Sequence, residues 1–198
     1  MSIYGEGHRK IQDTFDSRRL ADKLEEFIHD ELSDAEVEFV ESREMFFLAT
    51  VDENGHLNNS YKGGAPGFLK VVDRSTIAFP NYDGNGMYLS TGNISSSGEV
   101  ALLLIDFQNP TRTRINGTAT VSADDPLLAH WPGSNLVVRI KTREIFSNCP
   151  RYIHKMEFTD RSTDIPTETH TPPTAEWKKM EALRDVLPAN DPALAEDG

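Results

Sequence analysis

Two glycine-rich stretches decide how this sequence is interpreted: Ser60-Tyr61-Lys62-Gly63-Gly64-Ala65-Pro66-Gly67-Phe68 and Phe79-Pro80-Asn81-Tyr82-Asp83-Gly84-Asn85-Gly86. Each follows a run of β-forming residues, and each combines glycine with hydrogen-bonding side chains. Glycine allows a backbone to approach another molecule closely or to turn with positive φ. The two stretches therefore indicate a surface that receives a polar, phosphate-bearing ligand. A pair of hairpin turns is the alternative, because Asp-Gly and Asn-Gly are strong turn signals.

A series of short strands surrounds these stretches. The expected strands are Met45–Asp52, Leu57–Gly63, Phe68–Asp73, Ser75–Phe79, Val100–Phe107, Arg112–Ser122 and Leu136–Phe146. The Val100–Phe107 run is almost entirely apolar, which is typical of a strand covered on both faces. Short strands separated by turn signals favour a barrel or a sandwich.

The chain divides into three parts. Residues 1–32 form an N-terminal arm and helix, residues 33–158 hold the strands, and residues 159–198 form a proline-rich, acidic extension. Five of the eleven prolines lie in this last part, so much of it is expected to be extended.

Helices are expected in each part. Residues 1–15 have the character of a loose arm, and residues 17–31 carry apolar side chains at helical spacing. Ser33-Asp34-Ala35-Glu36 is a capping box, which predicts the start of a second helix. A third helix is expected from about Met87 to Ile94, and a short fourth over Ala175–Val186.

Charge and cysteine content limit the partners and the compartment. The formal net charge is −12, whereas nucleic acids and anionic membranes attract clustered Lys and Arg, so neither partner is expected. No apolar run approaches the ~20 residues of a membrane span, and residues 1–15 lack the apolar segment of a signal peptide. Cys149 is the single cysteine, which favours a reducing, cytoplasmic location.

Residues for metal binding or nucleophilic catalysis are sparse. No two of the six histidines are spaced as a ligand pair on one helix face, and Cys149 has no CxxC partner, so no metal site is expected. One histidine suffices for haem, which stays open as an alternative. Cys149 is expected to be a small buried residue beside a bend at Pro150. No catalytic acid, base or nucleophile is evident.

The segment from about Ser33 to Phe158 resembles the pyridoxamine 5′-phosphate oxidase-like flavoproteins, the split-barrel group that binds FMN. The resemblance lies in the order and spacing of several pieces. Besides the two stretches quoted above, they are Phe47-Leu48-Ala49-Thr50-Val51-Asp52-Glu53-Asn54-Gly55, Leu89-Ser90-Thr91-Gly92-Asn93-Ile94, Val100-Ala101-Leu102-Leu103-Leu104-Ile105-Asp106-Phe107 and Arg112-Thr113-Arg114-Ile115-Asn116-Gly117-Thr118-Ala119. It implies a mainly β (α+β) antiparallel split barrel with peripheral helices, and FMN bound in a groove between two protomers of a homodimer.

Ser60 and Lys62 are suited to bind a phosphate. Two positions apart in a strand, they point to the same face, where a hydroxyl and an ammonium can hold an anion. A strand-edge lysine kept for solubility is the alternative. In the resembled family this strand contacts FMN through cationic and backbone groups, which implies roles for Tyr61 and Gly63. Ser60 stands where the reference oxidases carry an arginine, so the phosphate site depends on Lys62.

The resemblance implies that the second stretch forms the next wall. The residues beside the flavin would be Phe79, Pro80, Asn81 and Tyr82. Asn85 takes the place of a phosphate-binding serine, but Met87 stands where the family usually has a lysine. Helix N-terminal amides near Gly86 could still bind an anion.

Arg112 and Arg114 share a face of a later strand. Arg112 falls where relatives place a polar residue against the pyrimidine edge of the flavin, and a cation there would stabilise the reduced ring. Packing against acidic neighbours is the alternative.

The resemblance implies an FMN-dependent oxidoreductase that acts on an unknown small molecule. Activity on pyridoxamine phosphate is not expected, because the family's C-terminal Trp and Arg-x-His signature is absent. Trp177 stands alone, and Arg184 is not followed by a histidine two residues on. The alternatives are a flavin-binding protein without turnover, and a split barrel that binds haem or a deazaflavin.

Overall fold

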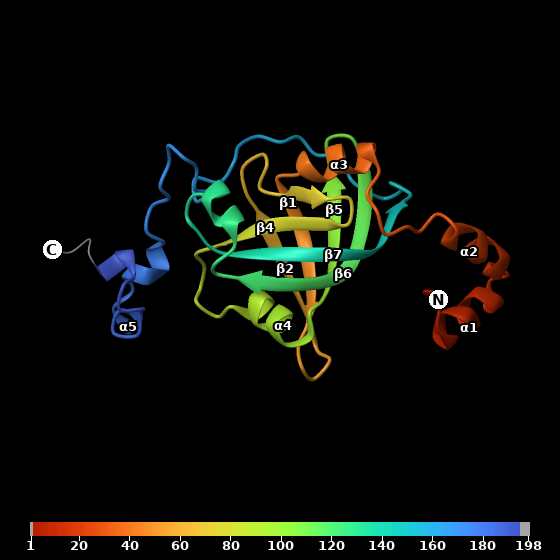
Figure 1. Ribbon diagram of the computed structural model, residues 1–198, viewed down its shortest axis with the longest axis horizontal. Coiled ribbons are helices and arrows are strands. Elements are labelled where there is room, and N and C mark those ends of the chain that lie inside the picture. The colour runs from red at the N-terminus through yellow and green to blue at the C-terminus, as the bar shows by residue number, and fades with distance from the viewer. Residues whose placement is uncertain (1, 195–198) are drawn as a thin grey trace.

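The computed structural model describes residues 2–194 and contains a seven-stranded antiparallel sheet with helices around it (Figure 1). The strands are β1 (Met45–Val51), β2 (Leu57–Gly63), β3 (Lys70–Asp73), β4 (Thr76–Tyr82), β5 (Glu99–Asp106), β6 (Thr111–Ser122) and β7 (Ser134–Asn148). Their order in the sheet is β2-β1-β5-β6-β7-β4-β3. All seven expected strands are present, and β2 has the bounds that the sequence predicts.

Aromatic contacts across the interior show that the sheet closes on itself. Three strands separate β1 from β4 in the sheet order. Nevertheless, the ring of Phe46 in β1 lies 5.1 Å, centroid to centroid, from Phe79 in β4 and 5.7 Å from Phe68. The edge strands β2 and β3 stand at opposite ends of the order and do not pair within the described sheet. The fold is therefore the expected mainly β (α+β) antiparallel split barrel with peripheral helices.

One face of each long strand fills the core. In β5, Leu102 and Leu104 are buried, whereas Leu103 and Ile105 on the opposite face are partly exposed. The barrel of a single chain therefore covers one face of this strand, and cover on both faces stays a prediction. The apolar run that suggested it places half of its side chains on the outside of the barrel.

A glycine allows β6 and β7 to pair across a bulge. The register of the two strands shifts between Asn116 and Gly117. A Cβ at Gly117 would lie 2.2 Å from the carbonyl oxygen of Lys141, closer than non-bonded atoms approach. Only glycine fits this position without backbone movement.

Two helices pack against the barrel. α3 (Asp34–Glu41) begins with the predicted capping box, in which Ser33 N donates to Glu36 Oε2 at 2.9 Å and Glu36 N donates to Ser33 Oγ at 3.4 Å. α4 (Leu89–Ser97) covers one end of the barrel (Figure 1) and starts two residues later than predicted.

The N-terminal arm is helical rather than loose. α1 (Glu6–Thr14) and α2 (Arg18–Glu25) lie to one side of the barrel (Figure 1), joined by an ion pair of 2.6 Å between Arg9 and Asp22. Neither helix buries a residue, so the apolar face predicted for residues 17–31 stays exposed in the single chain.

The described part of the chain beyond β7, up to residue 194, runs along the barrel to the side opposite the N-terminal helices (Figure 1). Cys149, the first residue beyond β7, is exposed, so the prediction that it is buried is wrong. The single helix expected over Ala175–Val186 is divided at Met180 into the 3-10 helix η2 (Glu176–Lys179) and α5 (Glu181–Arg184). The other 3-10 helices are η1 (Pro126–His130) and η3 (Pro192–Leu194). Part of the expected acidic tail, residues 195–198, lies outside the described residues.

Within residues 2–194, none of the helices combines the length and the apolar character needed to cross a lipid bilayer.

Candidate functional site

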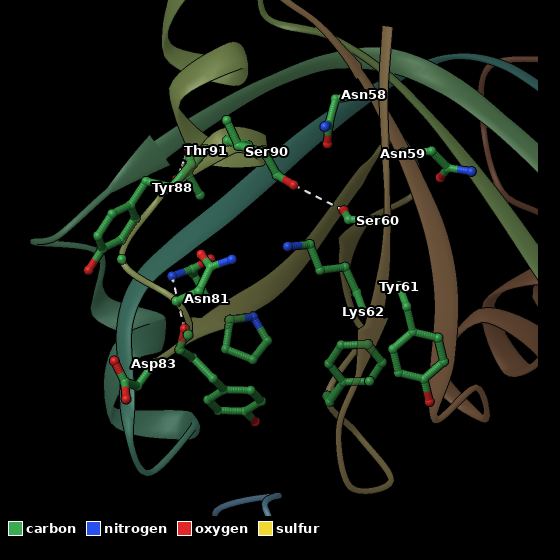
Figure 2. Close-up of a pocket in the computed structure, with 18 residues that line it drawn as sticks. Asn58, Asn59, Ser60, Tyr61, Lys62, Asn81, Asp83, Tyr88, Ser90 and Thr91 are labelled. Atoms are coloured by element: carbon green, nitrogen blue, oxygen red, sulfur yellow. Dashed lines mark hydrogen bonds between the residues drawn. The ribbon is translucent and has the colours of Figure 1, made fainter. Parts of the chain in front are cut away.

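A cavity of about 400 Å³ lies between β2, β4 and the start of α4 (Figure 2). This is called the first cavity. Its lining residues from β2 and the segment that follows are Asn58, Asn59, Ser60, Tyr61, Lys62, Gly63 and Phe68. From β4 to α4 they are Pro80, Asn81, Tyr82, Asp83, Gly84, Asn85, Gly86, Tyr88, Leu89, Ser90 and Thr91. The two glycine-rich stretches therefore meet at one cavity.

The strand order excludes hairpin turns at both stretches. β2 and β3 stand at opposite ends of the sheet, so the connection after Gly63 is no hairpin. β4 pairs with β3 and β7 and leads into α4, so the segment Asp83–Gly86 does not join paired strands either. The alternative interpretation of these stretches is wrong.

Side chains from β2 and α4 meet inside the first cavity. Ser60 Oγ and Ser90 Oγ form a hydrogen bond of 3.0 Å (Figure 2). Lys62 shares the strand face of Ser60, as expected, and its ammonium points into the cavity (Figure 2). Tyr61 turns to the other face, where its ring meets Phe47 edge-on at 6.2 Å. Two hydroxyls and a cation thus converge on one space.

The ammonium of Lys62 has no partner among the described residues. The side chain is half-buried, and no hydrogen bond or ion pair joins it to another of residues 2–194. Burial alone lowers the pKa of the Lys62 ammonium below its ordinary value. A cation that is partly removed from water without a partner is destabilising unless an anion joins it. Lys62 is therefore suited to receive an anionic group from a ligand.

The start of α4 adds further donors. No side chain caps this helix, whose N-cap residue Tyr88 has a φ of 49°. The first amides of a helix have no intrahelical partner, and the helix dipole favours negative charge there. Leu89, Ser90 and Thr91 of this first turn line the cavity. The geometry is that of an anion-binding helix terminus.

The loop between β4 and α4 closes the cavity. Asn81 Nδ2 donates to Asn135 Oδ1 at 2.9 Å, and Asn135 Nδ2 donates to the Tyr88 hydroxyl at 3.2 Å. Asn85 Oδ1 accepts a hydrogen bond of 3.0 Å from Met87 N, so its side chain shapes the loop. Burial raises the pKa of the Tyr82 hydroxyl above its ordinary value.

Three of the predicted site residues lie elsewhere in the single chain. Phe79 is buried in the core and does not line the first cavity. Arg112 and Arg114 share the outer face of β6, as expected, but do not line the cavity. Arg112 Nε and its cross-strand neighbour Asn148 Oδ1 are buried, and within residues 2–194 neither has a hydrogen-bond partner.

A second cavity of about 800 Å³ adjoins the first. The two share Tyr61, Gly63, Tyr82 and Asp83. The chain beyond β7 supplies part of its wall, where Met156 N donates to the carbonyl of Phe107 at 2.9 Å. Arg161 binds both carboxylate oxygens of Glu44, at 2.6 and 2.7 Å.

Sequence reasoning missed several residues of the site. Ser90 and Thr91 of α4 and Asp83 of the loop line the first cavity, but no short motif marks them as ligand-binding. The one signal for Ser90 and Thr91 is their position at a helix start directly after a glycine-rich stretch. For Asp83 the sequence offers only the turn signal Asp-Gly.

An antiparallel split barrel with a cavity beside Lys62 and the start of α4 defines the class of this protein. The sequence matches the family model described as "Pyridoxamine 5′-phosphate oxidase" over residues 32–157. The chain therefore belongs to the pyridoxamine 5′-phosphate oxidase family, as the sequence pieces indicate. A search of curated protein sequences finds no match.

Several solved structures are similar to the chain. One is a candidate pyridoxamine 5′-phosphate oxidase of Lactobacillus delbrueckii, 28% identical, with a TM-score of 0.49 over 60% of this chain and 95% of that one. HupZ of Group A Streptococcus is 18% identical, with a TM-score of 0.48 over 59% and 94%. An FMN-binding protein of Syntrophomonas wolfei is 15% identical, with a TM-score of 0.38 over 69% and 96%. The family assignment rests on the sequence match and on the strands described above.

Proposed function

We propose that this chain is a cytoplasmic, FMN-dependent oxidoreductase that binds the cofactor's phosphate in the first cavity. Lys62 would hold the phosphate by charge, and the first amides of α4 would donate hydrogen bonds to it. In the Ser60–Ser90 pair, the serine that accepts the hydrogen bond between them would donate its own hydroxyl hydrogen to the phosphate. The observation that carries the proposal is the half-buried Lys62, which no residue of the described chain neutralises. A phosphate monoester supplies the missing charge.

FMN fits these residues better than a dinucleotide. It carries one terminal phosphate, for which one ammonium, the Ser60–Ser90 hydroxyl pair and one helix terminus suffice. The chain has no Rossmann glycine fingerprint, which would cradle the pyrophosphate of FAD or a nicotinamide dinucleotide.

FMN supplies the redox chemistry when it is bound, and the protein positions and tunes it. In a homodimer, the outer face of β6 from one protomer would complete the groove of the other. Arg112 would then stand beside the flavin, which supports negative charge on the reduced ring. Arg112 Nε is buried and has no hydrogen-bond partner among residues 2–194, which suits such a role because a neighbouring group would satisfy it.

Activity on pyridoxamine 5′-phosphate is not proposed. The family signature of Trp and Arg-x-His near the chain end is absent, since Trp177 stands alone and Arg184 is followed by Asp185 and Val186. The substrate of this chain would be a different small molecule. Flavin binding without turnover, and a split barrel with haem or a deazaflavin, are the alternatives to exclude.

The absorption spectrum of the purified protein tests the cofactor. FMN gives flavin bands in the blue and near-ultraviolet, and haem would give a Soret band instead. Cofactor released by heat should run as FMN on chromatography. Recovery of FAD, haem or a deazaflavin, or no flavin uptake from excess FMN, would refute the proposal. Turnover is tested separately, by the oxidation of bound reduced FMN in the presence of candidate electron acceptors.

A further inference from the structure

The C-terminal extension contacts Asp83, a lining residue of the first cavity, through Lys178 of η2. Its ammonium nitrogen lies 2.6 Å from Asp83 Oδ2 and 2.7 Å from Asp191 Oδ2. Lys178 is only 5% exposed. Because water reaches so little of this side chain, its charge depends on the two carboxylates.

The two carboxylates have different roles. Asp191 belongs to the extension and is buried, and its second oxygen accepts a hydrogen bond of 3.0 Å from Ala193 N. Burial opposes the charge on Lys178, but the hydrogen bonds to Asp191 and Asp83 outweigh it and raise the pKa of the ammonium. The extension thus holds a preformed, charged lysine, and Asp83 is the barrel group that docks onto it.

Asp83 is the first residue of the loop between β4 and α4. It directly follows the last residue of β4 and lines the first cavity (Figure 2). It also lines the second cavity. Residues 83–88 have no partner in the sheet, so side-chain contacts determine where this loop lies. Asn135 anchors its far end through the Tyr88 hydroxyl. Lys178 anchors its near end, although 95 residues separate it from Asp83 in sequence.

We infer that Lys178 is a positioning residue, through which the C-terminal extension holds the loop of residues 83–88 over the first cavity and slows release of the cofactor. The pair Lys178–Asp83 is called the clasp. The inference rests on the proposed function only for the identity of the ligand. An intact clasp keeps Asn85 and Gly86 against the cavity, whereas a broken clasp frees the near end of the loop.

Hydrogen–deuterium exchange of the cofactor-free protein tests the clasp without any ligand. Lys178→Met keeps the length of the side chain and removes the charge. Amides of residues 83–88 should exchange on the order of ten-fold faster in this variant, the loss expected for a charge-assisted hydrogen bond, while β5 and β6 are unchanged. Lys179→Met is the matched control, because Lys179 is exposed and pairs with Glu176 of the extension itself. Equal exchange of the loop in wild type and Lys178→Met would overturn the clasp.

A second variant covers the case in which Lys178→Met disturbs folding. Asp83→Asn breaks the clasp from the barrel side, where the side chain is 72% exposed, and leaves Lys178 paired with Asp191. It should accelerate loop exchange as Lys178→Met does, and the double variant should add little to either. Lys178→Arg should restore slow exchange. Additive effects of the two changes would refute a direct link.

The rate of FMN release tests whether the clasp slows the loss of the cofactor. This rate is measured by the recovery of flavin fluorescence after dilution. Lys178→Met should release FMN several-fold faster than wild type or Lys179→Met, at equal thermal stability of the barrel. Faster loop exchange with unchanged release would show that the clasp does not control the cofactor. If the protein takes up no FMN, the proposed function fails, and the exchange experiment still decides whether the clasp exists.

Discussion

At the scale of single residues, Lys62 contrasts with Arg139 and Lys178, two cations that are paired with carboxylates. Arg139 binds both oxygens of Asp125, and Lys178 lies between two carboxylates. No carboxylate among the described residues pairs with Lys62, and burial lowers the pKa of its ammonium. A half-buried charge destabilises the fold when no nearby group of opposite charge offsets it. Such a destabilising residue is typical of a functional site.

Lys62→Met should therefore act in opposite directions on stability and binding. It should raise the melting temperature of the cofactor-free protein, because an unpaired, half-buried charge disappears. It should weaken FMN binding by roughly 1.5–3 kcal/mol, the scale of a charge-assisted hydrogen bond. The difference in affinity should shrink as salt rises. Calorimetric melting and flavin titration measure both effects.

Lys70→Met, in β3 and outside the first cavity, is the control and should leave FMN affinity unchanged. If Lys62→Met binds FMN as tightly as wild type at low salt, Lys62 is a strand-edge lysine that serves solubility. The phosphate site then lies elsewhere.

At the scale of elements, the β6–β7 bulge is a sharp test of packing. Gly117→Ala forces a methyl group against the Lys141 carbonyl and should destabilise the fold by about 1–3 kcal/mol, as overpacking does. Gly92→Ala, within α4, meets no atom within 4 Å and should stabilise by about 0.5–1 kcal/mol through helix propensity. Urea unfolding compares the two variants. Equal effects would contradict the close approach at Gly117.

The connection between β6 and β7 depends on Asp125, and this contact predicts a pH dependence. Hydrogen bonds from Arg139 hold the pKa of the Asp125 carboxyl below its ordinary value. A lowered folded-state pKa means that the stabilisation is complete above the unfolded value of about 3.9 and disappears as pH falls through the lower folded value.

Asp125→Asn should thus reduce the free energy of unfolding by about 1.5–3 kcal/mol at pH 7, because it removes a charge-assisted hydrogen bond. As pH falls below about 4, the difference in the free energy of unfolding between Asp125→Asn and wild type should narrow. Unfolding in urea across this range gives the profile, with exposed Asp124→Asn as the control. A difference between the two proteins that stays constant as pH falls below about 4 would show that the carboxylate charge is not responsible.

The strands could be predicted from the sequence because alternation and glycine turns are local signals. β4 shows the limit, since it continues through Pro80 to Tyr82, past the predicted end at Phe79. Beyond Ala78 only β7 pairs with β4, so a residue without an amide hydrogen is tolerated there. α1 was missed because it has one large apolar residue, Ile11, and no apolar periodicity.

The site could be predicted only where neighbours in sequence share a face, as Ser60 and Lys62 do. Its other contacts join distant segments: Ser60 with Ser90, and Asp83 with Lys178. Such contacts follow from the closure of the barrel, which no short window of sequence contains. The burial of Lys62 is likewise a property of the closed fold.

At the scale of the whole molecule, the outer face of the sheet is apolar enough to need cover. Tyr61, Phe47, Leu103, Arg114 and Phe146 pair in one row across β2, β1, β5, β6 and β7. The row runs from the first cavity to the arginines predicted to touch the flavin. A second copy that packs two-fold on this face would cover it and bring β6 of one protomer toward the cavity of the other.

This arrangement predicts that cofactor binding and assembly are linked. If FMN binds a groove shared by two protomers, it binds the dimer and not the monomer, so mass action makes FMN stabilise the dimer. Sedimentation at decreasing protein concentration should show dissociation at higher concentrations without FMN than with it.

Leu103→Glu, which places a charge in the middle of the row, should favour the monomer and lower FMN affinity together. Val72→Glu, on exposed β3 outside the row, should do neither. A Leu103→Glu monomer that keeps wild-type FMN affinity would mean that the cavity of a single chain suffices for binding, and Arg112 would then have no contact with the flavin.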